Sequence, residues 1–159
     1  MNQRKSLKEL NLLDKFLFDE AMDDPENVTT MLDIILSQNT NLKHPPQTEK
    51  EQRRSPDNRQ IRLDVYAVDE DDVIYEVEAQ KENTHNLPKR SRLYQGIIDS
   101  KLLPPGVVDF NLLNEVLIVL IMPFDLFGYG LYRYTFHMRC EEVPELKLND
   151  GATRIFLNT

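Results

Sequence analysis

The chain has 159 residues, of which 40% are hydrophobic and 29% charged, a composition typical of a single globular domain with its own core. Its formal net charge of −8 argues against broad nonspecific attraction to nucleic acid but does not exclude a local basic patch. The only cysteine, Cys140, excludes an internal disulfide and a cysteine zinc cluster, and the lack of a long apolar run predicts a cytoplasmic protein without a membrane span.

The first third of the chain predicts two helices followed by a loop. Apolar residues recur at helical spacing from Leu7 to Met22, which indicates an amphipathic helix. The pattern restarts with Asp24 as the candidate N-cap and Pro25 in the first turn, and this second helix is expected to end near Gln38. Residues 39–60 contain three prolines and almost no large apolar side chains, which predicts a long surface loop.

The rest of the chain alternates strand and helix patterns. A hairpin is predicted from Ile61–Val68 and Val73–Ala79, which flank the acidic turn "DEDD", and a helix from Pro88 to Leu103. The run "EVLIVLIMPF" indicates a strand buried on both faces. "GLYRYTFHMRCEE" and the final "RIFL" indicate two more strands. We therefore expect a mixed central sheet flanked by helices, with the hairpin and the apolar strand near its middle.

The second arm of the hairpin carries an unusual row of polar side chains. Because side chains alternate along a strand, Glu76, Glu78 and Gln80 share one face. Asp64 of the first arm joins that face only if it lies opposite residue 76 or 78, which requires an odd number of residues in the turn. An even number would place Asp64 opposite Val77 and separate the carboxylates.

Two carboxylates that converge in a partly buried place need compensation for their charge. A divalent cation is the usual solution, and Mg²⁺ or Mn²⁺ suits hard oxygen ligands that share the ion with water and a phosphate. Such an ion polarises a phosphodiester and lowers the pKa of a bound water. Phosphodiester hydrolysis is the chemistry that Asp64 and Glu78 would support best.

Five blocks of the sequence together resemble the PD-(D/E)xK nuclease family transposases, the recombination-promoting nuclease group. In chain order they are "LLDKFLFDEAM", "RLDVYAVDEDDVIYEVEAQK", "LPKRSRLYQGIIDSKLLPPG", "PFDLFGYGLYRYTFHMRCEE" and "LNDGATRIFLNT". The resemblance spans nearly the whole chain. It implies an α/β fold with a restriction-endonuclease-like core and a metal-dependent DNA endonuclease of the mobile-element or recombination type.

The resemblance also assigns roles to residues. Asp64 and Glu78 would hold Mg²⁺ or Mn²⁺, and Gln80 would orient the attacking water as the third catalytic residue. Many relatives of the wider fold have lysine at the position of Gln80, whereas this family typically carries Gln. An acidic residue on the first helix often adds a metal ligand in the wider fold, and Glu20 is the candidate here; an ordinary solvated helix face is the other interpretation.

Further side chains leave two interpretations open. Arg90, Arg92 and Tyr94 would contact DNA by resemblance, or would form a basic helix face paired with local acids. Glu76 is either a support for the site or an ordinary exposed residue, and the second interpretation is favoured. The aromatic residues are predicted to pack in the core and sheet rather than to stack on bases; they are Phe124, Phe127, Tyr129, Tyr132, Tyr134 and Phe136.

Two functions from different classes follow. The leading hypothesis is a magnesium-dependent DNA endonuclease, and the alternative is a nuclease-like fold that no longer cleaves and serves as a DNA-binding or protein-interaction module. We expect one domain over residues 1–159; relatives generally continue past "FLNT", which leaves open a C-terminal region that this chain lacks. A homo-oligomer is also left open.

Overall fold

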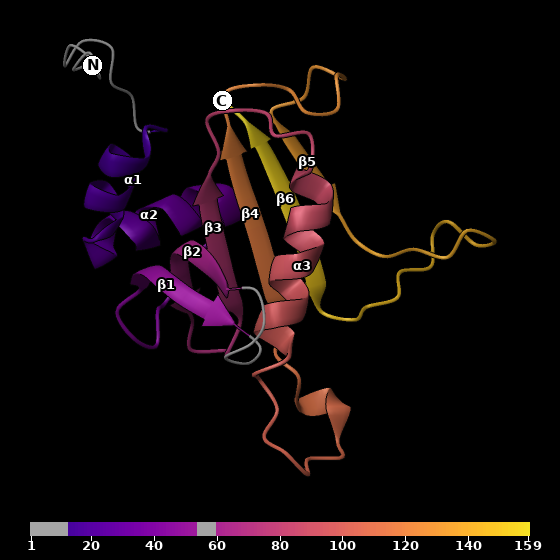
Figure 1. The fold of residues 1–159 in the computed structure, drawn as a ribbon. Helices are drawn as coiled ribbons and strands as arrows, with labels where there is room; N and C mark the ends of the chain where they lie inside the picture. Colours follow the sequence, from indigo (N-terminus) through magenta and orange to yellow (C-terminus); the bar gives the residue numbers. More distant parts are fainter. Residues whose placement is uncertain (1–12, 54–59) are drawn as a thin grey trace, which may run out of the picture.

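The computed structural model describes residues 13–53 and 60–159. A single six-stranded sheet forms its centre, with strand order β1-β2-β3-β4-β6-β5 (Figure 1). The sheet is mixed, because β1, β2 and β3 run antiparallel, β3, β4 and β6 run parallel, and β5 is antiparallel to β6. The elements are α1 (Lys15–Met22), α2 (Pro25–Leu36), β1 (Gln47–Arg53), β2 (Gln60–Val68), β3 (Ile74–Ala79), α3 (Leu87–Asp99), the 3₁₀ helix η2 (Phe110–Leu112), β4 (Val116–Met122), β5 (Arg133–Phe136) and β6 (Ala152–Asn158).

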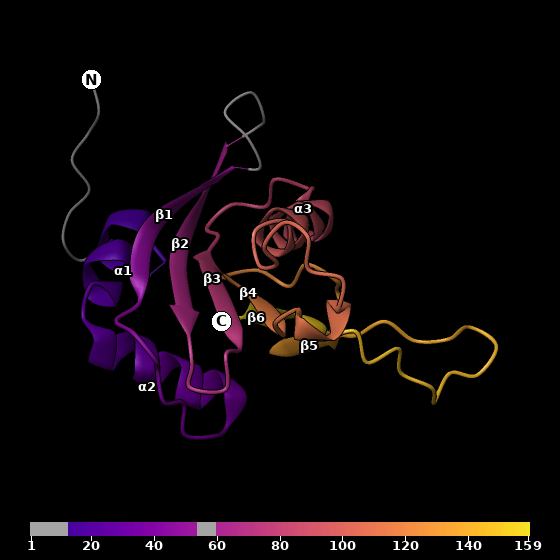
Figure 2. The ribbon, with the colours of Figure 1, turned by 90° about the horizontal axis from the view of Figure 1, so that it is seen from below.

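Helices cover both faces of this sheet (Figure 2). On one face, α1 and α2 bury Phe18 and Leu32 against strand residues such as Val77. On the other face, α3 buries Ile98 in a second core that includes Ile118 of β4. The predicted architecture, a mixed sheet flanked by helices, is confirmed. Of the strands predicted near its middle, β3 and β4 are the two central ones, and the first hairpin arm, β2, lies next to the edge strand β1.

The two N-terminal helices agree with the prediction where the structure describes them. Residues 7–12 of the first predicted helix lie outside the described part, and α1 begins at Lys15. Asp24 is the N-cap of α2, where its Oδ1 accepts a hydrogen bond from the Glu26 amide at 2.9 Å. No helix among residues 13–53 and 60–159 is long and apolar enough to cross a membrane.

The surface loop predicted over residues 39–60 is wrong in part, because Gln47–Arg53 form β1. This strand pairs with β2 from Gln47, opposite Tyr66, to Arg53, opposite Gln60. β1 is the edge of the sheet, and edge strands carry polar and charged residues that oppose pairing with other chains. An exposed edge strand therefore lacks the apolar alternation by which a strand is recognised in sequence.

The β2–β3 hairpin has the odd turn that the carboxylates require. Residues 69–73 separate the paired Val68 and Ile74, which makes a turn of five residues. Asp69 organises the turn: its Oδ1 accepts from the Val73 amide at 2.9 Å, and its Oδ2 accepts from the Tyr75 hydroxyl at 2.6 Å. The turn thereby fixes the register of everything that follows on β3.

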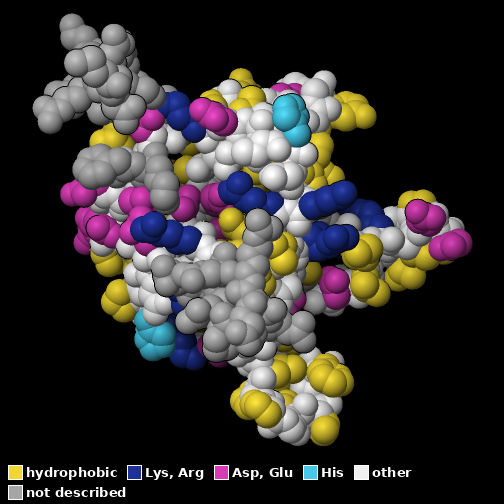
Figure 3. Space-filling view, viewed as in Figure 1, with side chains coloured by type: hydrophobic (Ala, Val, Ile, Leu, Met, Phe, Trp, Pro, Cys, Tyr) yellow, Lys and Arg dark blue, Asp and Glu magenta, His cyan; other side chains and the backbone are white. Residues whose placement is uncertain are grey.

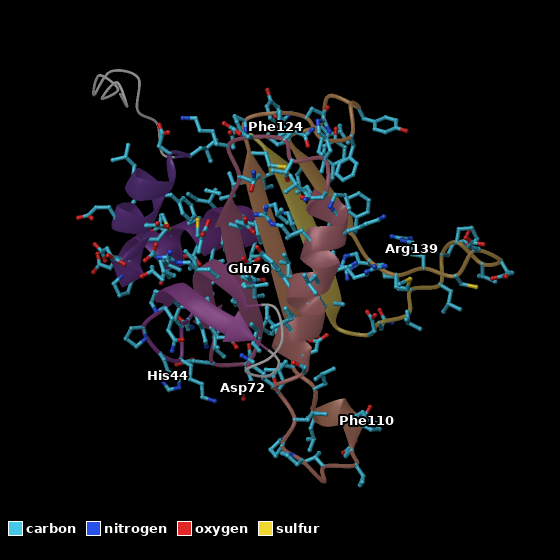
Figure 4. The ribbon with its side chains drawn as sticks, viewed as in Figure 1. His44, Asp72, Glu76, Phe110, Phe124 and Arg139 are labelled. Carbon is cyan, nitrogen blue, oxygen red and sulfur yellow. The ribbon has the colours of Figure 1, made fainter. Side chains whose placement is uncertain are left out.

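Two segments project from the body of the molecule. The loop with η2 exposes Phe110 at the bottom of Figure 4, and residues 137–150 extend to the right, with an isolated bridge between Arg139 and Lys147. α3 ends at Asp99 rather than Leu103, because residues 100–102 close in tight turns before Pro104. The aromatic prediction holds for Phe124, Phe127 and Tyr134, which pack against the α3 core, and the ring centroid of Tyr134 lies 4.9 Å from that of Phe127. Phe136 contacts the Phe127 ring at 5.0 Å between centroids but is 43% exposed, so the prediction holds for it only in part. It is wrong for Tyr129 and Tyr132, which are 81% and 82% exposed.

Candidate active site

The hairpin brings Asp64 to Glu78 as the register demands. Val65 pairs with Val77, and one step further along the same register Asp64 faces Glu78. The Asp64 Oδ2 accepts a hydrogen bond from the Ala79 amide at 3.3 Å, so its side chain reaches across to β3. Both carboxyl side chains are buried, at 7% exposure each. The sequence-predicted pair therefore shares one place in the fold.

Asp64 lies where β2 departs from a regular strand. Pairing with β3 ends at Val65, and the position opposite Asp64 on β1 is Glu49, which has a positive φ of 50° and breaks the β1–β2 ladder. The alternation of side chains also shifts here, because Leu63 packs in the α3 core while Val65 packs in the α1–α2 core. A regular strand would put Leu63 and Val65 on one face. The irregularity is what frees Asp64 to turn toward β3.

Glu76 is buried rather than exposed, so the favoured interpretation from sequence is wrong. Its exposure is 0%, and neither of its carboxyl oxygens has a hydrogen-bond partner among the described residues. Figure 4 places it at the middle of the sheet, beside α3. Burial, and after it the neighbouring charge of Asp64, raises the pKa of Glu76 well above its ordinary range, while Arg90 opposes this shift. A third acid thus belongs to the site.

Arg90 links Glu78, near the end of β3, to Gln80, which directly follows the strand. Its guanidinium forms an ion pair with Glu78, and its Nη2 donates a hydrogen bond to the Gln80 Oε1 at 2.9 Å. The amide of Gln80 is held from its other side, since its Nε2 donates to the Glu82 carbonyl at 2.6 Å. The remaining oxygen of Glu78, Oε2, is buried and has no hydrogen-bond partner among the described residues.

α3 delivers Arg90 because its apolar stripe fixes its rotation. Leu87 and Ile98 are buried against the sheet, which places Arg90 and Tyr94, one turn apart, above β3. The Arg90 guanidinium lies 5.6 Å from the centre of the Tyr94 ring, within the range of a cation–π contact. Burial raises the pKa of the Tyr94 hydroxyl, so it stays a neutral donor.

The site gathers three buried acidic side chains, Asp64, Glu76 and Glu78, beside the guanidinium of Arg90. The raised pKa of Glu76 means that, without a bound cation, this group is held in its neutral form. A divalent cation would stabilise the charged form of these groups, and the buried oxygens of Glu76 and Glu78 that have no hydrogen-bond partner among the described residues are suitable hard ligands. The donor set therefore fits such a cation, although no three Asp, Glu, His or Cys residues in the described ranges are already arranged to share one.

Other sequence candidates do not join the carboxylates. Glu20 is exposed on α1, a helix that packs against the opposite face of the sheet. Arg92 is exposed on α3, unlike Arg90. Lys81 follows Gln80 but pairs with Asp14 beside α1, as the alternation of faces predicts. The metal role of Glu20 and the DNA contact of Arg92 stay predictions that no contact in the site supports.

Comparison with known proteins gives a single finding. A family model described as "PD-(D/E)XK nuclease family transposase" matches residues 12–158. No curated protein matches, and neither does any solved structure. The match covers nearly all of the chain, and the mixed sheet with its three helices agrees with the α/β restriction-endonuclease-like fold that the resemblance implied. The chain belongs to the PD-(D/E)XK nuclease family transposases.

Proposed function

We propose that this protein is a DNA endonuclease that hydrolyses phosphodiester bonds with the help of Mg²⁺ or Mn²⁺. The family supports a nuclease. The observation that carries the finer proposal is the meeting of Asp64 and Glu78 on adjacent strands, with a buried Glu78 oxygen that has no hydrogen-bond partner in the part of the chain that the structure describes. Hydrolysis of DNA places a phosphate, itself an anion, beside these acids, and a cation is needed between them.

Asp64 and Glu78 would hold the cation through their carboxyl oxygens. When bound, the cation polarises the phosphodiester and lowers the pKa of a water molecule. Asp64 is already fixed for this role, because the Ala79 amide orients its carboxylate. The burial of both acids excludes bulk water, which strengthens every charge interaction in the site.

DNA would approach along α3 despite the acidic net charge. Lys89 and Arg92 are exposed on this helix, and Figure 3 shows further Lys and Arg side chains gathered around it. Most acidic side chains in this view lie to the left of α3, and a few lie on the projecting segment at the right. Such a separation lets a chain of charge −8 offer a local basic surface to phosphates.

The proposal is tested by titrating Mn²⁺ and Mg²⁺ into the parent protein and Asp64→Asn, with a supercoiled-plasmid nicking assay on the same samples. We expect the parent to bind and nick, and Asp64→Asn to lose both, with nicking reduced at least about 100-fold. Asp71→Asn is the matched control, since Asp71 is an exposed acid in the same hairpin. Equal nicking by Asp64→Asn and the parent would refute the site, whereas metal or DNA binding without nicking by the parent would favour the non-cleaving module.

A further inference from the structure

We propose that Arg90 is a catalytic residue that places its positive charge on the reacting phosphate, and that Gln80 holds Arg90 there instead of orienting the water. This inference rests on the proposed nuclease function and deepens it. It assigns to an α3 side chain a role at the chemical step, and it separates Arg90 from Arg92, which the sequence could only group together as DNA contacts.

The reaction needs a positive charge that Gln80 cannot supply. Cleavage of a phosphodiester builds negative charge on the phosphate oxygens and the leaving oxygen, and fixed cations that face these atoms lower the barrier. The amide of Gln80 is neutral. Lys81, next in sequence, points away and pairs with Asp14. Arg90 is the cationic side chain that contacts both Glu78 and Gln80.

Arg90 has two anchors, and only one of them is a proposed metal ligand. If Glu78 held a cation, its ion pair with Arg90 would weaken, but the bond from Arg90 Nη2 to Gln80 Oε1 involves no proposed metal ligand and would remain. The Glu82 carbonyl keeps the Gln80 amide nitrogen on the far side, so Oε1 stays toward Arg90. Gln80 therefore retains the guanidinium at the site in both states.

Arg90 also has a free donor. Its Nε is buried and lacks a hydrogen-bond partner among the described residues, a costly arrangement for a charged group. A phosphate oxygen is a strong acceptor for a guanidinium donor and would satisfy Nε. The contact with the Tyr94 ring restricts the side chain, so little freedom is lost when the phosphate arrives.

The test moves the charge from position 90 to position 80. A lysine at position 80 is one bond longer than Gln80, and the two side-chain ends already meet at 2.9 Å, so its ammonium reaches the region of the guanidinium. The variants are Arg90→Met, Arg90→Met with Gln80→Lys, and Lys43→Met as the control, which loses one positive charge from an exposed site beside the hairpin turn, away from α3. Nicking is measured as kcat and KM, with Mn²⁺ titration and thermal melting on each protein.

We expect Arg90→Met to lower kcat about 100-fold with little change in KM, and to bind Mn²⁺ at least as tightly as the parent because Glu78 is released. Adding Gln80→Lys should restore kcat about tenfold or more, and Lys43→Met should cut almost like the parent. A folded Arg90→Met that cuts normally, or a double variant that binds Mn²⁺ without any recovery, overturns this inference alone. A parent that does not cut overturns the proposed function as well.

Discussion

Glu76 combines complete burial with a raised pKa. A carboxyl group that is fully buried, without hydrogen-bond partners and beside Asp64 destabilises the fold when it is ionised. Proteins keep such groups where function needs them, and active sites are where strongly raised carboxyl pKa values gather. We therefore expect Glu76 to lower the free energy of unfolding, and its neutral isostere Gln to raise it again.

The change Glu76→Gln tests this cost. We expect the metal-free variant to unfold with a free energy about 1–3 kcal/mol higher than that of the parent near neutral pH, measured by urea denaturation. The raised pKa means that the folded chain keeps a proton that the unfolded chain has released. The parent should then lose stability as the pH rises from the ordinary Glu range to the folded pKa, and the variant should lack this decline.

The matched control is Glu82→Gln, because Glu82 is an exposed acid that lies only four positions after Glu78 in the sequence. It should leave both the unfolding free energy and its pH dependence near those of the parent. Equal stability of Glu76→Gln and the parent across that pH range would mean that Glu76 is not held as a buried acid in solution.

Among the elements, the five-residue turn decides whether the site exists. Asp69 accepts hydrogen bonds from the Asp71 and Val73 amides and from the buried Tyr75 hydroxyl. If the turn lost or gained one residue, Glu78 would face the α1–α2 core and Val77 would face Asp64. One buried carboxylate in the turn thus supports the pairing of Asp64 with Glu78, four residue pairs beyond Val68 and Ile74.

Asp69→Ala is expected to destabilise the protein by about 2–4 kcal/mol, because it leaves the Tyr75 hydroxyl and two amides without acceptors. Thermal melting and urea denaturation measure the loss. Asp71→Ala removes an exposed acid from the same turn and should change stability by less than about 0.5 kcal/mol. Similar melting of the two variants would show that Asp69 does not set the turn.

The sequence predicts those elements whose burial leaves a periodic signal. The hairpin, β4 and the capped α2 were all recognisable in this way, and so was the shared face of Asp64 and Glu78. β1 was not, because an edge strand with one partner needs no apolar face. The burial of Glu76 and the partners of Arg90 could not be predicted from the sequence either, since both depend on how α3 packs across β3.

At the scale of the whole molecule, the distribution of charge matters more than its sum. The chain carries 27 acidic and 19 basic residues, yet the α3 side presents Lys89 and Arg92 to solvent. DNA binding by such a surface should be strongly salt-dependent, since each phosphate contact releases counterions. The acidic remainder of the surface would limit the orientations in which a duplex can approach.

Reversing one charge on the α3 side tests whether DNA binds there rather than elsewhere on the surface. We expect Lys89→Glu to weaken duplex binding, measured by fluorescence anisotropy in Ca²⁺, and to reduce the slope of log affinity against log salt by about 1 or more. Lys43→Glu makes the same change in net charge beside the hairpin turn, where Lys43 pairs with Asp72, and should have a much smaller effect. Equal losses in both variants would mean that DNA does not approach along α3.

The site residues Asp64, Glu76, Glu78, Gln80, Arg90 and Tyr94 all lie within residues 64–94, the single stretch that contains most of the hairpin and the first half of α3. The loop with η2 and the projection of residues 137–150 lie outside that stretch and contribute none of these side chains. Insertions, deletions or exchanges in the two projections can thus reshape the outline of the molecule while the residues of the proposed site keep their places and their contacts with one another.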